Sequence, residues 1–202
     1  MKLYNLKAGM NPRRVRIFLA EKGVQIPAVD IDMAKGENAT PEFLNMNPLG
    51  KLPVLELDDG TFLSESIAIC RYIEKLYPDP NLFGATPTER AIVEMWNRRM
   101  ELELVVPMSA QFTHLSSFYA GRTEQVAAYG AYARAHALRT LTWLDVELAQ
   151  RTYIASDRYS VADISAQCAV LLGKNTGVPL PQSLENLARW WGDVSSRPTA
   201  RA

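Results

Sequence analysis

Two short stretches in the first third of the chain carry residue types whose spacing could do chemistry. Residues 47–55 (NPLGKLPVL) place Pro53 at the mouth of a strand, and residues 63–69 (LSESIAI) place Glu65 and Ser66 where the next helix should begin. A proline at a strand mouth leaves nearby backbone groups unpaired and available. A helix start offers free N–H groups and a positive dipole end to an anion. Together these features predict a cradle for a small peptide-like ligand that carries a carboxylate.

The elements that must position this cradle alternate between strand and helix. Strand patterns cover residues 2–6, 28–32, 54–57 and 61–63, and helical patterns cover residues 12–23, 41–44 and 69–76. The order is therefore β-α-β followed by β-β-α. Prolines at positions 78 and 80 exclude a continuing helix. Beyond them strand signals vanish, and apolar residues at a spacing of three or four between 126 and 148 predict the core of a helical bundle.

Two domains follow from this pattern: an α/β domain over residues 1–78, a linker over 79–87, and an all-helical domain over 88–202. Within the helical part, Ser160 with Asp163 three residues later resembles a capping box, in which aspartate replaces the usual glutamate. We interpret this motif as structural. Replacing Ser160 by alanine should cost about 1 kcal/mol of stability.

Composition restricts the class of function. Lys plus Arg and Asp plus Glu both number 22, so the formal net charge of zero gives no reason to expect nucleic acid or an acidic membrane surface as a partner. No apolar run approaches the length of a membrane span, and the N-terminus lacks a signal-peptide core, so a cytoplasmic location is expected. Cys70 and Cys168 sit among apolar residues and are expected to be buried thiols. Two cysteines and two histidines form no recognisable zinc pattern, so no metal is expected.

Three motifs in this order resemble those of a known family. Residues 47–55 (NPxGxxPVL), residues 64–69 (SESxAI) and residues 159–164 (YSVADI) look like the cytosolic glutathione transferases, in which a thioredoxin-like domain precedes a helical one. The resemblance covers essentially the whole chain, and the joint occurrence of the motifs is highly specific. Residues 12–23 and 101–104 are similar to a theta-like bacterial and fungal branch.

The resemblance implies roles for the cradle. The Leu52–Pro53 bond would be cis and would turn the N–H and C=O of Leu52 toward the cysteinyl part of glutathione. Glu65 and Ser66 would bind the γ-glutamyl amine and carboxylate. The alternatives are a trans proline at a sheet edge and plain helix capping by the Glu-Ser pair.

Three further side chains are candidates for the glycyl carboxylate of glutathione. Lys51 is the first candidate, and Lys35 and Asn38 are weaker ones. A solvated side chain is an equally good interpretation of each lysine.

The chain departs from the family at the group that activates the thiol. Other members place a Tyr, Ser or Cys in the loop after the first strand, whereas Tyr4 comes too early and Gly9 occupies the serine position. Our hypothesis is that the thiolate lies near the N–H groups of Met10 and Asn11, with Gly9 leaving room for it. Two alternatives remain for Asn11: it donates its amide directly to the thiolate, or it is an N-cap next to Pro12.

A water held by the helical domain is expected to supply a further hydrogen bond or take the thiol proton. The resemblance assigns this water to a Ser and a His on the first long helix of that domain. Ser109 matches the Ser, but Thr113 stands at the His position and His114 follows it. Ser109 and Thr113 share a helical face at i and i+4, whereas His114 is rotated by about 100°, so a partly exposed helix histidine is the alternative for His114.

The arginines of the first predicted helix have no obvious role there. Arg13, Arg14 and Arg16 stand at or near the start of the helix, where cations are unfavourable for the dipole. They are expected to be solvated, to pair with acids elsewhere, or to favour an anion nearby.

The leading functional prediction is a glutathione transferase that conjugates glutathione to small hydrophobic electrophiles, with a possible attack on peroxides. The electrophile would lie between the domains. Its expected lining is Met10, Val106, Phe112 and Phe118, each of which could equally be packing.

The chief alternative is a non-catalytic glutathione-binding or scaffolding protein with the same fold. Thiol-disulfide exchange is disfavoured because Cys70 and Cys168 are misplaced, and a maleylacetoacetate-type isomerase because the first helix lacks a Ser-rich start. A homodimer is expected from the resemblance, and the interface candidates are Tyr72, Met95, Arg99 and Glu103.

Overall fold

The computed structural model describes residues 1–202, which divide into two compact units. The first unit is Met1–Asn81 with Arg201–Ala202, and the second is Leu82–Ala200. All strands belong to the first unit, and the second is helical. The predicted fold class, an α/β domain followed by an all-helical domain, is confirmed.

The α/β domain is built on a four-stranded mixed sheet in the order β2-β1-β3-β4. The strands are β1 (Lys2–Asn5), β2 (Ala28–Asp30), β3 (Val54–Glu56) and β4 (Phe62–Leu63). β1 pairs in parallel with β2 and antiparallel with β3, where Tyr4 is opposite Val54. β3 then pairs antiparallel with β4. The pattern places both the end of β1 and the loop before β3 at the same edge of the sheet.

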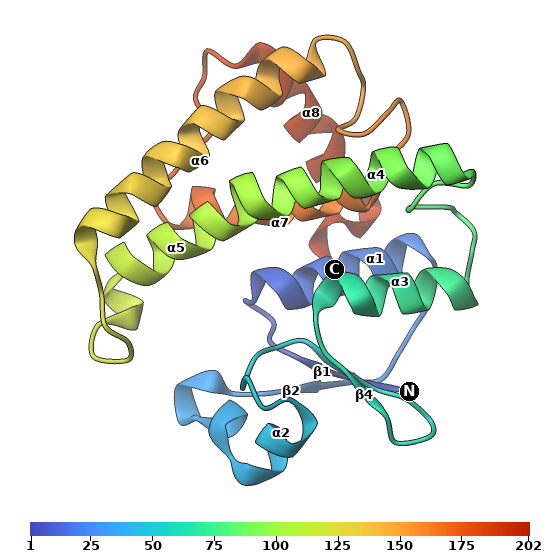
Figure 1. Ribbon diagram of the computed structural model, residues 1–202, viewed down its shortest axis with the longest axis vertical. Helices are drawn as coiled ribbons and strands as arrows, with labels where there is room; N and C mark the ends of the chain where they lie inside the picture. Colours follow the sequence, from blue (N-terminus) through green and yellow to red (C-terminus); the bar gives the residue numbers. More distant parts are fainter. The chain divides into compact units, whose positions relative to one another are not determined.

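Helices cover both faces of this sheet. α1 (Met10–Glu21) and α3 (Ser66–Leu76) pack together on one face, and α2 (Pro41–Met46) lies on the other, after the short 3₁₀ turns η1 (Met33–Lys35) and η2 (Glu37–Ala39) (Figure 1). The apolar face predicted for α1 is buried, and Phe18 is fully inaccessible. The face predicted for α3 is buried at Ile69 and Ile73, but it is wrong at its end, because Leu76 is 48% exposed. Cys70 and Cys168 are buried and form no disulfide.

The helical domain is organised around one long rod. α4 (Pro87–Met100), a π-helical segment η3 (Glu101–Val105) and α5 (Val106–Leu115) follow one another without a break, and α6 (Ala127–Leu148) packs along them (Figure 1). α7 (Val161–Asn175) is buried over most of its length, and α8 (Glu185–Ser196) packs on α6 and α7. The 3₁₀ turns η4 (Ser117–Tyr119) and η5 (Pro198–Arg201) complete the chain. None of these helices combines the length and apolar character needed to cross a membrane.

The predicted stripe of α6 is wrong at its beginning. Val126 and Tyr129 are both 47% exposed, and the buried face starts at Gly130. The reason is close packing, because a Cβ at Gly130 would lie 2.7 Å from Cγ of Leu115 on α5. A side chain at position 130 would require Leu115 to move, so the small residue and not the neighbouring aromatic faces the partner helix.

The predicted start of α7 is present, and the Asp163 carboxylate accepts hydrogen bonds from both the backbone and the side chain of Ser160. The Asp163 carboxylate accepts from the N–H of Ser160 at 2.9 Å and also from the Ser160 hydroxyl at 3.0 Å. It further accepts from the N–H of Ile154 and from Nε1 of Trp190, both at 2.9 Å. Asp163 is fully buried, and that burial raises the pKa of its carboxyl above the ordinary value. Asp163, more than Ser160, therefore holds this part of the domain together.

Candidate functional site

The loop that enters β3 is organised by the buried side chain of Asn47. Its Nδ2 donates to the carbonyl of Lys51 at 2.8 Å, and its Oδ1 accepts from the N–H of Leu49 at 3.2 Å. The carbonyl of Asn47 also accepts from the N–H of Gly50 at 2.9 Å. An Asx turn of this kind fixes a loop without regular secondary structure. Asn47 belongs to the motif of residues 47–55, but no local pattern in the sequence indicates this role for its side chain.

Leu52 is held so that its backbone faces outward. The Leu52–Pro53 peptide bond is cis. The Leu52 side chain is buried in a cluster with Phe43 and Val54. Neither the N–H nor the carbonyl of Leu52 has a backbone partner. A pair of unused main-chain groups just before β3 can form hydrogen bonds with an extended peptide-like ligand.

The three candidates for the glycyl carboxylate differ in their contacts. Asn38 donates from Nδ2 to the carbonyl of Gly50 at 2.8 Å, so its amide N–H is engaged in shaping the loop. Gly50 has φ +62°, and a Cβ there would lie 3.1 Å from the carbonyl oxygen of Asn38, which requires glycine. Lys35 forms an exposed ion pair with Asp32 at 3.3 Å. Lys51 is exposed and makes no ion pair, which leaves its ammonium group available.

The start of α3 carries the acid and the hydroxyl that the sequence singled out. Glu65 precedes the helix with φ +65° and ψ 112°, and it is the only residue other than glycine with a positive φ. Such a conformation costs about 1–3 kcal/mol and is found at functional sites. Ser66 is buried, and its Oγ accepts from Nη1 of Arg14 at 2.7 Å. Arg14, from α1, therefore places a positive charge directly beside the first residue of α3.

The start of α1 has no side-chain cap. Gly9 is the N-cap, the first turn contains no acidic residue, and the N–H groups of Met10 and Asn11 have no hydrogen-bond partner. The interpretation of Asn11 as the N-cap is therefore wrong. Its Oδ1 is buried without a partner. Two free N–H groups at a positive dipole end form a site for an anion.

Packing within the protein, and not only a ligand, favours glycine at position 9. A Cβ at this position would lie 2.9 Å from Cγ and Cδ of Pro12 and 3.2 Å from the carbonyl oxygen of Leu6. A proline ring cannot swing away as a long side chain can. The hypothesis that glycine leaves room for a thiol must therefore be tested separately from this contact.

Tyr4 is occupied elsewhere in the domain. Its hydroxyl donates to Oε2 of Glu56 at 2.9 Å, and Nζ of Lys2 donates to the same oxygen at 3.0 Å. Burial and the hydrogen bond to the Glu56 carboxylate raise the pKa of Tyr4 above its ordinary value. A tyrosine that ionises less readily and already has an acceptor is unsuited to activate a thiol, as its sequence position indicated.

Two of the three arginines of α1 are structural in a way that the sequence did not show. Arg14 is 2% exposed and bonds to Ser66, which is 52 residues away along the chain. Arg16 donates to the last residue of β1 and to two carbonyls in the loop that follows it. The interpretation of these two as solvated side chains is wrong.

In the helical domain, the three residues proposed to hold a water have different contacts. The Ser109 hydroxyl donates to the carbonyl of Val105 at 2.9 Å, so its oxygen can only accept from a further partner. His114 Nδ1 accepts from the N–H of Val126 at 3.1 Å, and its ring lies edge-on to Tyr129. The side chain of Thr113 is half-buried on the face of Ser109. These contacts favour the structural alternative for His114.

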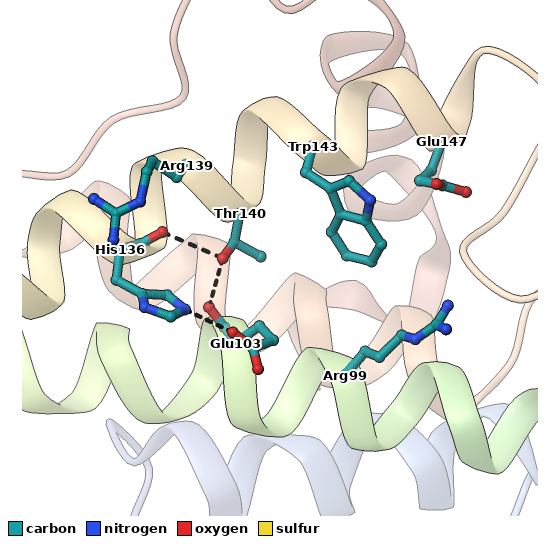
Figure 2. A pocket seen from close by; sticks show the side chains of 7 residues that line it. All are labelled: Arg99, Glu103, His136, Arg139, Thr140, Trp143 and Glu147. Atoms are coloured by element: carbon teal, nitrogen blue, oxygen red, sulfur yellow. Dashed lines mark hydrogen bonds and ion pairs between the residues drawn. The ribbon is translucent and has the colours of Figure 1, made fainter.

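A groove of about 560 Å³ lies between η3 and α6 in the helical domain (Figure 2). Its lining residues are Arg99, Glu103, His136, Arg139, Thr140, Trp143 and Glu147. Nε2 of His136 pairs with Oε2 of Glu103 at 2.7 Å, and the Thr140 hydroxyl donates to the carbonyl of Glu103 at 2.9 Å (Figure 2). No group of three or more His, Cys, Asp or Glu side chains could hold a metal ion.

Comparisons with known proteins agree with these features. The model of the glutathione S-transferase N-terminal domain matches residues 1–75, and that of the C-terminal domain matches residues 104–198. Glutathione S-transferase 2 of Saccharomyces cerevisiae is 38% identical over 205 residues, which cover 100% of this chain and 88% of that protein.

Two solved structures share the whole fold. The crystal structure of Gtt2 from Saccharomyces cerevisiae has a TM-score of 0.95 at 38% identity, covering 100% of this chain and 99% of the other. A glutathione S-transferase domain-containing protein from Marinobacter aquaeolei has a TM-score of 0.96 at 36% identity, covering 99% of this chain and 100% of the other.

Proposed function

The chain belongs to the glutathione S-transferase family, and we propose that it binds glutathione, stabilises its thiolate and conjugates it to small hydrophobic electrophiles. The observation that carries this proposal is the pairing of unused backbone groups at Leu52 with the acid and hydroxyl at the start of α3. The first suits the amide of a cysteinyl residue, and the second suits an amino acid head group.

In this proposal each end of glutathione has a named partner. Glu65 binds the γ-glutamyl ammonium, and Ser66 binds the adjacent carboxylate, with Arg14 behind the Ser66 hydroxyl as a compensating charge. Lys51 is the proposed partner of the glycyl carboxylate, because its ammonium is exposed and makes no ion pair. Lys35 and Asn38 are weaker proposals, since an aspartate and a backbone carbonyl already engage them.

Thiol activation has to come largely from the backbone. A free thiol has a pKa of about 8.5, and lowering it to about 6.5 requires roughly 2.7 kcal/mol of preferential stabilisation of the thiolate. A helix N-terminus supplies about 0.3–1 kcal/mol, or about 2 kcal/mol in a partly buried site. One hydrogen bond to a charged acceptor adds about 1.5–3 kcal/mol. The N–H groups of Met10 and Asn11 together with one strong further donor, or with two weaker ones, therefore reach the required magnitude.

The further donor is proposed to be a water on Ser109 or the amide of Asn11. Because the Ser109 hydroxyl donates to Val105, a water there would donate one hydrogen to Ser109 and keep the other for the thiolate. Thr113 shares the face of Ser109 and is its proposed companion. The Asn11 side chain is the competing donor.

The electrophile is proposed to contact aromatic side chains of the helical domain. Phe112 and Phe118 stack with ring centroids 6.0 Å apart, and Phe118 and Val106 are about half-exposed. Exposed aromatic rings next to one another suit a flat apolar ligand. Met10 at the start of α1 is a further candidate. Peroxides are a second class of electrophile that the same thiolate could attack.

A homodimer is proposed through the groove between η3 and α6. Its lining carries two arginines and two glutamates, and Met95 and Leu102 on the rod of α4, η3 and α5 are exposed. A two-fold interface places one surface against itself, so a surface that carries both signs of charge can pair its arginines with the glutamates of a second copy. Arg99→Glu combined with Arg139→Glu is expected to give a monomer by sedimentation velocity. A wild-type monomer, or an unaffected dimer, would contradict the proposal. Tyr72 remains a predicted contact.

The experiment that tests the function combines retention on immobilised glutathione with turnover of 1-chloro-2,4-dinitrobenzene and cumene hydroperoxide. Retention with conjugation supports a transferase. Retention without turnover over a panel of electrophiles favours a binding or scaffolding protein, and absence of both contradicts the proposed site. Glu65→Gln should lose retention, whereas the matched control Glu42→Gln, an exposed acid in the first turn of α2, should keep it.

A further inference from the structure

The loop between β1 and α1 is held by the guanidinium group of Arg16. Nη1 of Arg16 donates to Oδ1 of Asn5 at 2.5 Å and to the carbonyl of Leu6 at 3.3 Å, and Nη2 donates to the carbonyl of Lys7 at 2.8 Å. These acceptors are consecutive in the chain. The planar fork of an arginine can bind several of them at once, whereas an ammonium group cannot reproduce that geometry.

Asn5 anchors this arrangement in the sheet. Its side chain is 2% exposed, and its Nδ2 donates to Oδ1 of Asp30 at 2.6 Å. The hydrogen bond from Asn5 is the main reason that the pKa of Asp30 lies below its ordinary value. The Asn5 carbonyl also accepts from the N–H of Ile31 at 2.8 Å. Arg16 is thereby tied through Asn5 to the ends of both β1 and β2.

The loop held by Arg16 ends at the uncapped start of α1. The Leu6 carbonyl that accepts from Arg16 also accepts from the N–H of Gly9 at 2.9 Å. Gly9 in turn accepts from the N–H of Arg13 at 3.0 Å, the first bond of the helix. Met10, Asn11 and Pro12 lie between. Pro12 has no N–H, so the two N–H groups left without a partner are those of Met10 and Asn11. The position of these two donors therefore depends on the carbonyl that Arg16 holds.

We propose that Arg16 is a positioning residue for thiol activation, which fixes the Met10 and Asn11 N–H groups where the thiolate of glutathione binds. This inference rests on the proposed function. Donors that are held in place before the charge develops stabilise it without a cost of reorganisation. Arg16 acts through the loop, while the groups that bind the rest of glutathione lie on the loop before β3 and at the start of α3. Loss of Arg16 should therefore affect ionisation of the thiol more than binding.

The charge of Arg16 and its contribution to stability must be separated from positioning. The positive charge by itself could lower the pKa of a nearby thiol without any hydrogen bond. A general loss of stability could lower activity without any change at the thiol. Arg16→Lys keeps the charge and removes the fork, and Arg16→Met removes both. Arg189→Lys is the matched control, because Arg189 donates to the carbonyls of Leu148, Arg151 and Thr152 in the helical domain.

The measurement is the pH titration of the thiolate absorbance of glutathione bound to each protein, combined with amide hydrogen exchange of residues 6–11 without ligand. Both Arg16 variants are expected to raise the apparent pKa by about one unit, which lowers kcat about tenfold below that pKa. The KM for glutathione should change by less than about threefold. Exchange over residues 6–11 should accelerate in both variants. Arg189→Lys should lower the melting temperature without moving the pKa.

The outcomes distinguish a failure of the proposed function from a failure of the positioning role of Arg16. If wild-type protein does not ionise bound glutathione, the proposed function fails before Arg16 is considered. If wild-type protein does ionise it and Arg16→Lys keeps both the wild-type pKa and the wild-type exchange, the positioning role is wrong. An effect of Arg16→Met alone would indicate charge and would likewise overturn positioning. Should either variant fail to fold, Asn5→Ser removes one partner of the fork and must shift the pKa in the same direction.

Discussion

The helices α1 and α7 begin in opposite ways. At α7 the Asp163 carboxylate accepts four hydrogen bonds, two of them from Ser160 and the others from Ile154 and Trp190. At α1 the N-cap is Gly9, with no side chain, no acid in the first turn and two N–H groups without partners. A glycine at the N-cap, in place of Ser, Thr, Asn or Asp, costs only about a few tenths of a kcal/mol. The difference teaches that the carboxylate satisfies the start of one helix, while the other start leaves two donors unpaired, which our proposal assigns to the thiolate.

The largest expected effect tests the stabilising side of this comparison. Asp163→Ala leaves the buried donors of Ser160, Ile154 and Trp190 without an acceptor, each at a cost of about 1–3 kcal/mol. We expect the free energy of unfolding to fall by about 3 kcal/mol or more, measured by urea denaturation. Ser160→Ala should cost only about 1 kcal/mol. Equal losses in the two variants would show that the carboxylate is not the centre of this network.

The second prediction extends the comparison of helix starts to α3. Glu65→Gln removes the carboxylate proposed to bind the ammonium of glutathione, a charge-assisted bond of about 1.5–3 kcal/mol. The Kd for glutathione should rise about 10- to 100-fold by calorimetry. The melting temperature should change little, because the residue is exposed. A variant that binds normally would mean that the strained Glu65 is not a ligand.

The third prediction distinguishes two reasons for glycine at position 9: packing against the Pro12 ring and room for the thiol of glutathione. Gly9→Ala should lower kcat roughly tenfold, because its Cβ would lie 2.9 Å from the Pro12 ring and at the start of α1. Pro12→Ala removes that ring. If the double variant Gly9→Ala/Pro12→Ala regains activity, packing of the first turn was responsible. If activity stays low while Pro12→Ala alone is active, the Cβ itself obstructs the thiol, as our hypothesis requires.

The smallest expected effect concerns the helical domain. Ser109→Ala should raise the apparent pKa of bound glutathione by about half a unit, because one water-mediated hydrogen bond to the thiolate is lost. The stability of the domain should change little, since the hydroxyl bonds only to its own helix. His114→Gln serves as the comparison. It should weaken the contact with Val126 at the start of α6 and leave the pKa of the thiol unchanged.

Local patterns predicted most of the fold but few of the contacts that hold the site. The alternation of strands and helices, the turn at the two prolines and the start of α7 depend on neighbours in the sequence. The bond from Arg14 to Ser66 spans 52 residues, and no spacing rule reports it. The arginines near the start of a helix did signal an unusual environment, because the dipole disfavours them there. The contact of Gly9 with Pro12 depended on side-chain packing and was also missed.

The central claim is that the uncapped start of α1 stabilises the thiolate of bound glutathione. Its most direct test is the pKa of that thiol, titrated by thiolate absorbance in the wild-type complex from about pH 5 to about pH 9, against free glutathione near 8.5. The account predicts a bound pKa of about 6.5, and an increase toward the free value in Gly9→Ala. A bound pKa that stays near 8.5 in the wild-type protein would contradict it.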